Sequence, residues 1–94
     1  MILVITSKSC PGCQQAKKSI EEGQVTFCDI EDNEECLRKA NELGAEYIPA
    51  FVKETEEGSV LCEIEDATDD VLVLKCGDEK ITIKLKNQNQ DGGN

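Results

Sequence analysis

The chain has 94 residues, a net charge of −10, 20 acidic side chains, six cysteines and no histidine. This length suffices for one domain with a single modest core. The acidic balance argues against binding to nucleic acid or to anionic membrane surfaces. The absence of histidine excludes Cys-His and Ser-His-Asp catalysis and histidine-containing metal sites. We expect a cytoplasmic monomer, because Met1 leads directly into an apolar run without a signal peptide and no run is long enough to span a bilayer.

The first predicted elements are a buried strand, a helix and a second strand. Residues 2–6 form a continuous apolar run, which is typical of a strand buried on both faces. A helix is predicted over residues 11–22, because Pro11 is favoured at the first helical position and Gly23 is a suitable stop. Residues 25–30 predict another strand. Together these elements indicate a right-handed βαβ unit with parallel strands.

A second helix and two further strands are predicted next. Asn33 is a favoured N-cap residue, and Gly44 is expected to end the helix that it begins. Residues 47–52 predict a loop that leads into a third strand. A hairpin turn over residues 56–58 then leads into a fourth strand over residues 60–64.

The segment after residue 65 allows two interpretations. Residues 71–74 are rich in β-branched side chains, and residues 80–86 alternate with period two. We therefore favour a β-hairpin over a helix followed by a strand. Residues 87–94 are polar and rich in glycine near their end, so we expect a disordered tail.

Cys10 and Cys13 are the candidate catalytic residues. Their C-x-x-C spacing at a strand-to-helix junction is typical of a redox dithiol. Cys10 is the predicted N-cap residue, where unpaired N–H groups and the helix dipole stabilise negative charge. We therefore expect its thiol to ionise more readily than a free cysteine, whose pKa is about 8.5. Lys8 adds a smaller, screened positive charge, and Lys17 and Lys18 complete a positive island around the dithiol.

Two motifs, in this order of elements, resemble those of the thioredoxin superfamily. They are Cys10-Pro11-Gly12-Cys13 and Ile48-Pro49, and the chain is most similar to glutaredoxins and small glutaredoxin-like redoxins. The resemblance covers roughly residues 1–65. It implies an α/β, thioredoxin-like βαβαββ fold with a mixed sheet, in which an extra hairpin replaces the C-terminal helix. It thus implies a single domain over residues 1–86, with residues 1–65 as core and residues 66–86 as β extension.

The resemblance also implies a substrate site and an activity. Ile48–Pro49 is then a cis peptide bond whose loop faces Cys10, and Lys8, Pro11 and Gly12 complete the substrate-binding residues. The implied protein is a disulfide reductase with no cofactor beyond its own disulfide. Its partners are a disulfide-containing protein, or a small-molecule disulfide, and either a reductase or glutathione as electron donor. The donor stays open, because the paired-glycine and aspartate motif with which glutaredoxins bind glutathione is absent.

The expected mechanism is dithiol–disulfide exchange. The Cys10 thiolate attacks a substrate disulfide, and Cys13 then attacks Cys10 and releases the reduced product. Thioredoxins place a buried acid six residues before the first active cysteine, but Val4 holds that position here. The sequence therefore identifies no side chain that accepts the proton of Cys13.

The other four cysteines are interpreted separately. Cys28, Cys36 and Cys62 are expected to act as small buried hydrophobes. Cys76 falls in a predicted turn, so it is expected to be the most exposed, and a regulatory or intermolecular thiol is the alternative there. Cys62 and Cys76 are able to pair only if their strands are neighbours.

Three other readings of the cysteines are weaker. A metal or iron–sulfur module built on Cys10 and Cys13 lacks a second closely spaced cysteine pair. A non-catalytic adaptor that binds a partner through the C-terminal hairpin does not need an intact C-x-x-C motif. A secreted disulfide scaffold does not account for the ordinary helix and strand patterns.

Overall fold

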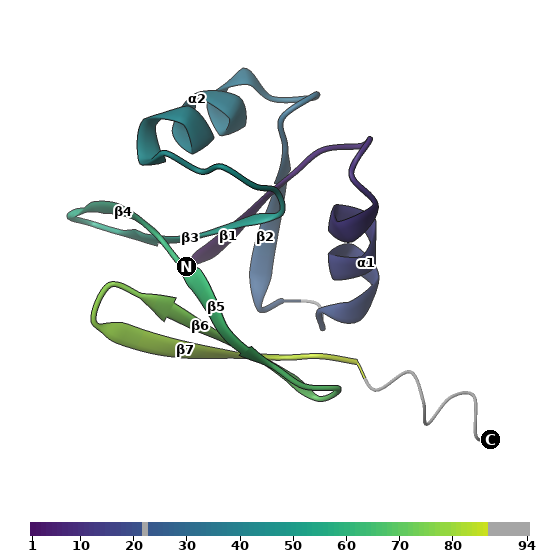
Figure 1. The fold of residues 1–94 in the computed structure, drawn as a ribbon. Coiled ribbons are helices and arrows are strands. Elements are labelled where there is room, and N and C mark those ends of the chain that lie inside the picture. Colours follow the sequence, from purple (N-terminus) through teal and green to yellow (C-terminus); the bar gives the residue numbers. More distant parts are fainter. Residues whose placement is uncertain (22, 87–94) are drawn as a thin grey trace.

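The structure is a computed structural model that describes residues 1–21 and 23–86 (Figure 1). The described residues form seven strands and two helices, in the order β1 (Ile2–Thr6), α1 (Pro11–Ser19), β2 (Val25–Asp29), α2 (Glu34–Leu43), β3 (Ala50–Thr55), β4 (Gly58–Leu61), β5 (Glu63–Ala67), β6 (Val71–Cys76) and β7 (Glu79–Lys84). The predicted tail over residues 87–94 lies outside the described residues. Among the described residues, no helix is long and apolar enough to cross a membrane.

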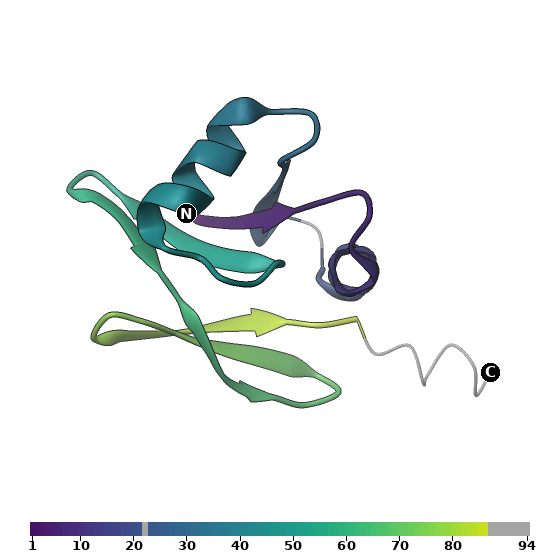
Figure 2. The same ribbon diagram turned by 45° about the horizontal axis from the view of Figure 1, so that its top comes forward.

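The strands form two separate sheets. The first is four-stranded with the order β2-β1-β3-β4, in which β1 and β2 are parallel and the other neighbours are antiparallel. The second is three-stranded and antiparallel, with the order β5-β6-β7. Figure 2 shows the second sheet on the side of the first that is opposite α2.

The predicted thioredoxin-like βαβαββ fold is wrong. Strands predominate, and they divide between two sheets instead of forming one. The single strand predicted over residues 60–64 is interrupted at Cys62, so that β4 ends in the first sheet and β5 begins the second. The hairpin predicted after residue 65 is confirmed as β6 and β7, but it pairs with β5 and not with the first sheet.

The period-two alternation of β1 divides the core into two parts. Leu3 and Ile5 face α2, and they belong to a cluster that is completed by Cys36, Ala40, Ala50 and Val52. Ile2 and Val4 point to the opposite face. They pack in a cluster with Ile20, Phe51, Cys62, Leu72, Leu74, Cys76 and Ile83. The second sheet and α1 therefore cover the face of the first sheet that α2 leaves open.

Both helices begin where the sequence predicts, and α2 also ends at the predicted residue, whereas α1 ends earlier than predicted. Asn33 caps α2 by accepting from the N–H of Glu35, and Gly44 ends it with a φ of 74°. The helix α1 was expected to reach residue 22, but it ends at Ser19. Ile20 instead adopts extended backbone and forms a β-bridge with Leu85. The contact with the chain after β7 therefore shortens α1; residue 22 lies outside the described residues.

All six cysteines are paired as three disulfides. The pairs Cys10–Cys13, Cys28–Cys36 and Cys62–Cys76 have Cα separations of 5.2, 6.0 and 4.2 Å. The expectation that Cys28, Cys36 and Cys62 are only small hydrophobes is wrong. So is the expectation of an exposed Cys76, which is buried at the end of β6 beside the junction between β4 and β5. The alternative pairing of Cys62 with Cys76 is confirmed.

Candidate active site

The dithiol lies where β1 passes into α1. Cys10 is the N-cap residue, with φ −99° and ψ 110°, and Pro11 occupies the first turn as predicted. The backbone N–H of Cys13 lies 3.1 Å from Sγ of Cys10 and donates to it. Cys10 is half-buried, whereas Cys13 is fully buried. An incoming disulfide can therefore reach the sulfur of Cys10 more easily than that of Cys13.

The Ile48–Pro49 loop faces the dithiol. Its peptide bond is cis, as the resemblance implied. The carbonyl oxygen of Ile48 lies 3.7 Å from Sγ of Cys10. A Cβ atom at Gly12 would lie 3.7 Å from Cδ of Pro49, which is an ordinary van der Waals contact. The structure thus brings Cys10, Gly12, Ile48 and Pro49 together at one surface.

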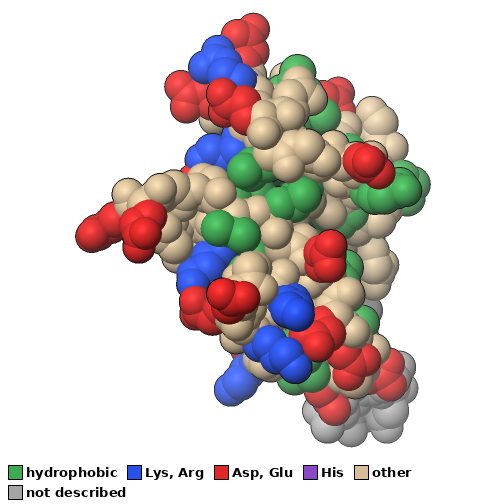
Figure 3. Space-filling view, turned by 60° about the vertical axis from the view of Figure 1, so that its left-hand side comes forward, with side chains coloured by type: hydrophobic (Ala, Val, Ile, Leu, Met, Phe, Trp, Pro, Cys, Tyr) green, Lys and Arg blue, Asp and Glu red, His purple; other side chains and the backbone are tan. Residues whose placement is uncertain are grey.

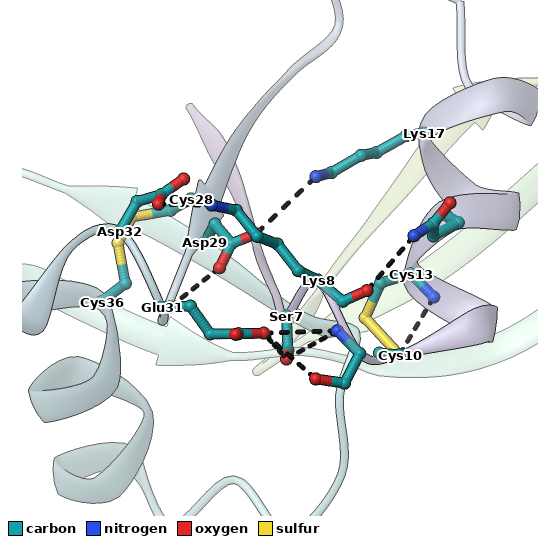
Figure 4. Close-up of polar contacts among 12 residues, drawn as sticks. Ser7, Lys8, Cys10, Cys13, Lys17, Cys28, Asp29, Glu31, Asp32 and Cys36 are labelled. Atoms are coloured by element: carbon teal, nitrogen blue, oxygen red, sulfur yellow. Dashed lines mark hydrogen bonds and ion pairs between the residues drawn. A yellow bond between two sulfur atoms is a disulfide. The ribbon is translucent and has the colours of Figure 1, made fainter.

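Lys8 is held by a carboxylate and not directed at the dithiol. Its Nζ donates to Oδ1 of Asp32 across 2.8 Å, and both side chains are exposed. The hydrogen bond and the charge of Asp32 raise the pKa of Lys8 above its ordinary value. Nζ of Lys17 similarly lies 4.0 Å from Oδ2 of Asp29. Two of the three lysines of the predicted positive island are therefore paired with acids, one at the end of β2 and one in the segment that follows it (Figure 4).

Glu31 is a residue of this site that the sequence interpretation missed. Its Oε2 accepts from the Ser7 hydroxyl at 2.6 Å, and from the backbone N–H and hydroxyl of Ser9 at 3.2 and 3.3 Å. The Ser7 hydrogen bond is the main cause that lowers the pKa of Glu31. Glu31 thereby fixes the loop that leads directly into Cys10 (Figure 4).

The position of Glu31 follows from the pairing of β1 and β2. These strands are parallel, and their last residues, Thr6 and Asp29, are partners in the register. The segments that follow them therefore leave the sheet at the same edge. The predicted βαβ unit already implied this arrangement, so it was the signal that would have placed the acids of residues 29–32 beside the dithiol.

A cavity of about 420 Å³ has Pro49 in its lining. It is bounded by the loop after α2, by the start of β3 and by the junction between β4 and β5. Two of its lining side chains are large, apolar and exposed: Tyr47 at 81% and Ile64 at 56%. Glu46 and Glu63 also line it. One face of the molecule shows the same mixture, with acidic side chains spread around exposed apolar ones (Figure 3).

A second depression, of about 480 Å³, lies beside the segment after β2. Lys8, Lys17, Asp29 and Asp32 contribute charges of both signs to its lining, and Cys28 contributes to its wall. Within the described residues, no three cysteine, aspartate or glutamate side chains are grouped so that they could hold a metal ion. The nucleophilic groups at the junction of β1 and α1 are the sulfurs of Cys10 and Cys13.

Comparison of the chain with protein-family models, with curated proteins and with solved structures gave no match.

Proposed function

We propose that the protein is a thiol–disulfide oxidoreductase that reduces disulfides through Cys10 and Cys13. The observation that carries the proposal is the placement of the pair. The sulfur of Cys10 is half-buried at the N-terminus of α1 and accepts the N–H of Cys13, while Cys13 itself is fully buried. Helix N-termini favour the thiolate, which is the attacking form of cysteine. This arrangement supports one nucleophilic sulfur and one resolving sulfur.

The proposed reaction has two exchange steps. The Cys10 thiolate attacks one sulfur of the substrate disulfide, and the other substrate sulfur leaves as a thiolate with the electron pair of the broken bond. The Cys13 thiolate then attacks Sγ of Cys10, which releases the second substrate thiolate. Both released thiolates take protons from water. The substrate disulfide is thereby reduced by two electrons, and the pair Cys10–Cys13 is oxidised to a disulfide.

The proposed substrate is a disulfide in an extended protein segment, which binds beside Ile48 and Pro49. The carbonyl of Ile48 is 3.7 Å from Sγ of Cys10, so a backbone that pairs with this loop would hold its disulfide near the attacking sulfur. Gly12 has no side chain to obstruct such a segment, and a Cβ at this position would lie 3.7 Å from Cδ of Pro49. The motifs at Cys10–Cys13 and Ile48–Pro49 are also those that resemble glutaredoxin-like redoxins, and a relationship to that family is proposed from these motifs alone.

The electron donor in this proposal is a reductase in preference to glutathione. The carboxylates of Glu31 and Asp32 lie next to the loop that carries Lys8 and Ser9. They would repel the two carboxylates of glutathione, and Lys8 is already paired with Asp32. Turnover with glutathione and with a thioredoxin-type reductase, compared at equal thiol concentration, tests this preference.

The cytoplasm is the compartment expected from the sequence, and it suits a dithiol that acts as a reductant. The pairs Cys28–Cys36 and Cys62–Cys76 are more typical of oxidising compartments. Rapid alkylation of the protein in intact cells, followed by mass spectrometry, distinguishes the cytoplasm from an oxidising compartment. A cytoplasmic reductant would show Cys10 and Cys13 alkylated, whereas three closed disulfides would place the protein in an oxidising compartment.

The proposed activity is tested with serine variants. Reduction of a protein disulfide by dithiothreitol should be accelerated by the native chain and not by Cys10→Ser. Without dithiothreitol, the reduced Cys13→Ser variant should stop after the first step and accumulate a mixed disulfide with the substrate, which a non-reducing gel detects. The double variant Cys28→Ala/Cys36→Ala is the control and should retain activity. Equal rates for the native chain and Cys10→Ser would refute the proposal and favour an adaptor.

A further inference from the structure

Thr6 presents an unpaired hydroxyl in the interior. It is the last residue of β1 and is 0% exposed. Among the described residues, its Oγ1 is the one buried side-chain oxygen or nitrogen of a non-exposed residue without a hydrogen-bond partner. Leaving a buried hydroxyl unpaired costs about 1–3 kcal/mol, so such groups are rare in folded proteins. The hydroxyl therefore requires an explanation.

The position of Thr6 places this hydroxyl beneath the start of α1. Side chains of a strand alternate between its faces, so Thr6 shares the face of Ile2 and Val4. That face is covered by α1, since Ile20 belongs to the same cluster as Val4 and Ala16 packs against it. The helix runs back along the strand from the end at which Thr6 lies.

The spacing of strand and helix residues indicates which helix residue lies level with Thr6, namely Cys13. It precedes Ala16 by three positions, so the two share one face of α1. Two residues along a strand advance about 6.6 Å, and three to four residues along a helix advance about 4.5–6 Å. Successive residues on the facing sides of the strand and the helix therefore have similar spacing. From this spacing we infer that Thr6 lies opposite Cys13, one step along the strand and helix from the packing of Val4 and Ala16 in one cluster. Both Thr6 and Cys13 are fully buried.

We propose that the Thr6 hydroxyl donates a hydrogen bond to the sulfur of Cys13 when the Cys10–Cys13 disulfide is open. In the structure this disulfide is closed, and a disulfide sulfur is a weak acceptor. A thiolate is a much stronger one, because hydrogen bonds to a charged acceptor are about twice as strong as neutral ones. The hydroxyl is unpaired in the oxidised protein and would gain its partner on reduction.

This inference rests on the proposed function and deepens its second step. The Cys13 thiolate attacks Sγ of Cys10 in the mixed disulfide, the bond from Cys10 to the substrate sulfur breaks, and the substrate leaves as a thiolate. Thr6 keeps its proton throughout, and its hydrogen bond increases the fraction of Cys13 that is ionised. It also favours the dithiol over the disulfide, because only the dithiol form satisfies the hydroxyl.

The test compares Thr6→Val, which removes the hydroxyl and keeps the shape, with Thr6→Ser, which keeps the hydroxyl. The first readout is the equilibrium of the Cys10–Cys13 pair with dithiothreitol, followed by mass spectrometry of the peptide that carries both cysteines. We expect Thr6→Val to shift the equilibrium constant of the Cys10–Cys13 pair with dithiothreitol about tenfold toward the Cys10–Cys13 disulfide. This corresponds to a reduction potential of the pair that is about 30 mV more negative. Thr6→Ser should stay within about twofold of the native chain (about 9 mV on the same scale).

The second readout is the pH dependence of the resolving step. Glutathione is attached to Cys10 through a mixed disulfide, and its release by Cys13 is timed between pH 5 and pH 10. In Thr6→Val the pH of half-maximal rate should rise, because the thiolate loses its donor, while Thr6→Ser should keep the native profile. A merely structural role would change the stability of the protein without moving this midpoint.

The outcomes separate this inference from the proposed function. If Thr6→Val and Thr6→Ser both match the native chain in equilibrium and in pH midpoint, the Thr6 inference is overturned, whatever the activity. If Thr6→Val shifts both readouts but the native chain fails to reduce protein disulfides, the inference holds and the proposed function fails. A pair that dithiothreitol cannot open would overturn both. Urea unfolding of both variants verifies that each is folded.

Discussion

The backbone N–H of Cys13 lies 3.1 Å from Sγ of Cys10 and donates to it. The half-buried Cys10 is thereby held at the first turn of α1 by the buried Cys13. This contact joins the two chemical roles of the dithiol. Its donor would stabilise a negative sulfur at Cys10. The surrounding carboxylates of Glu31 and Asp32 act in the opposite sense, so the reactivity of Cys10 reflects a balance between the helix and the acids.

Removing one of these acids should make Cys10 more reactive. Asp32→Asn frees the ammonium of Lys8, which the structure pairs with Asp32. Reduced Cys10 should then react with iodoacetamide roughly two- to threefold faster at pH 7 and low salt, because an exposed charge pair contributes less than about 1 kcal/mol. The gain should disappear at about 1 M salt, where the Debye length is only about 3 Å. An unchanged or slower rate at low salt would show that Lys8 does not act on the sulfur.

The space beside Pro49 should be sensitive to the size of residue 12. A Cβ at Gly12 would make only an ordinary contact with Pro49, at 3.7 Å from its Cδ. Gly12→Ala should therefore keep activity, and it should raise the free energy of unfolding by up to about 1 kcal/mol through helix propensity. Gly12→Phe should lower kcat/KM for a protein disulfide by roughly tenfold, or about 1.4 kcal/mol.

A small-molecule disulfide provides the control for Gly12→Phe. It needs no room for a peptide segment beside Pro49, so its rate should change by less than about twofold, which is under 0.5 kcal/mol. Equal losses for both substrates would indicate damage to the dithiol itself. If Gly12→Phe kept its full rate with both substrates, protein substrates would not pass over Gly12.

The disulfide at the junction of the sheets should contribute strongly to stability. Cys62–Cys76 closes a sequence separation of 14 residues, and Cys28–Cys36 one of 8. A disulfide lowers the conformational entropy of the unfolded chain, and more so for a longer loop. The free energy of unfolding should therefore fall by about 3 kcal/mol in Cys62→Ala/Cys76→Ala and by about 2.5 kcal/mol in Cys28→Ala/Cys36→Ala. Urea unfolding measures both. Only the first pair joins the two sheets, so only its removal should loosen β5 to β7 in hydrogen exchange.

Glu31 should make stability depend on pH in acid. The hydrogen bond from Ser7 lowers the pKa of Glu31 in the folded protein. Its contribution is thus complete above the unfolded-state value of about 4.3 and is lost as the pH falls through the lower, folded value. Glu31→Gln should remove this part of the acid dependence. Glu57→Gln, in the exposed turn between β3 and β4, serves as control and should follow the native curve below pH 5.

Local signals in the sequence predicted most of the first half of the chain. The apolar run of β1, proline at the start of α1 and the Asn33 cap each act within a few residues, and the structure has all three where they were expected. Cys10 at the N-cap was also correct. The cis bond before Pro49 was correct too, but it was implied by the resemblance and not by a local signal. The alternation of residues 80–86 was sufficient to predict β7, which ends at Lys84, because successive strand residues face opposite sides of the sheet.

The errors arose where distant segments decide the structure. Nothing local marks Leu61 as the end of β4, since the apolar alternation continues to Ile64; the break at Cys62 depends on β5 pairing with β6. The early end of α1 depends on Leu85, which bridges Ile20 from across the sequence. The neutralisation of Lys8 and the position of Glu31 depend on the register of β1 with β2. Pairing and register depend on residues far apart in the chain, so patterns that extend over a few residues do not predict them.

The redox titration of the Cys10–Cys13 pair tests the central claim most directly. The protein is equilibrated in thiol buffers of defined potential, and the alkylated cysteines are assigned by mass spectrometry. We expect a reversible two-electron couple confined to Cys10 and Cys13, at a potential between roughly −270 and −200 mV, with the other two disulfides still closed. A pair that does not cycle, or that opens only after Cys28–Cys36 and Cys62–Cys76 have opened, would contradict the account.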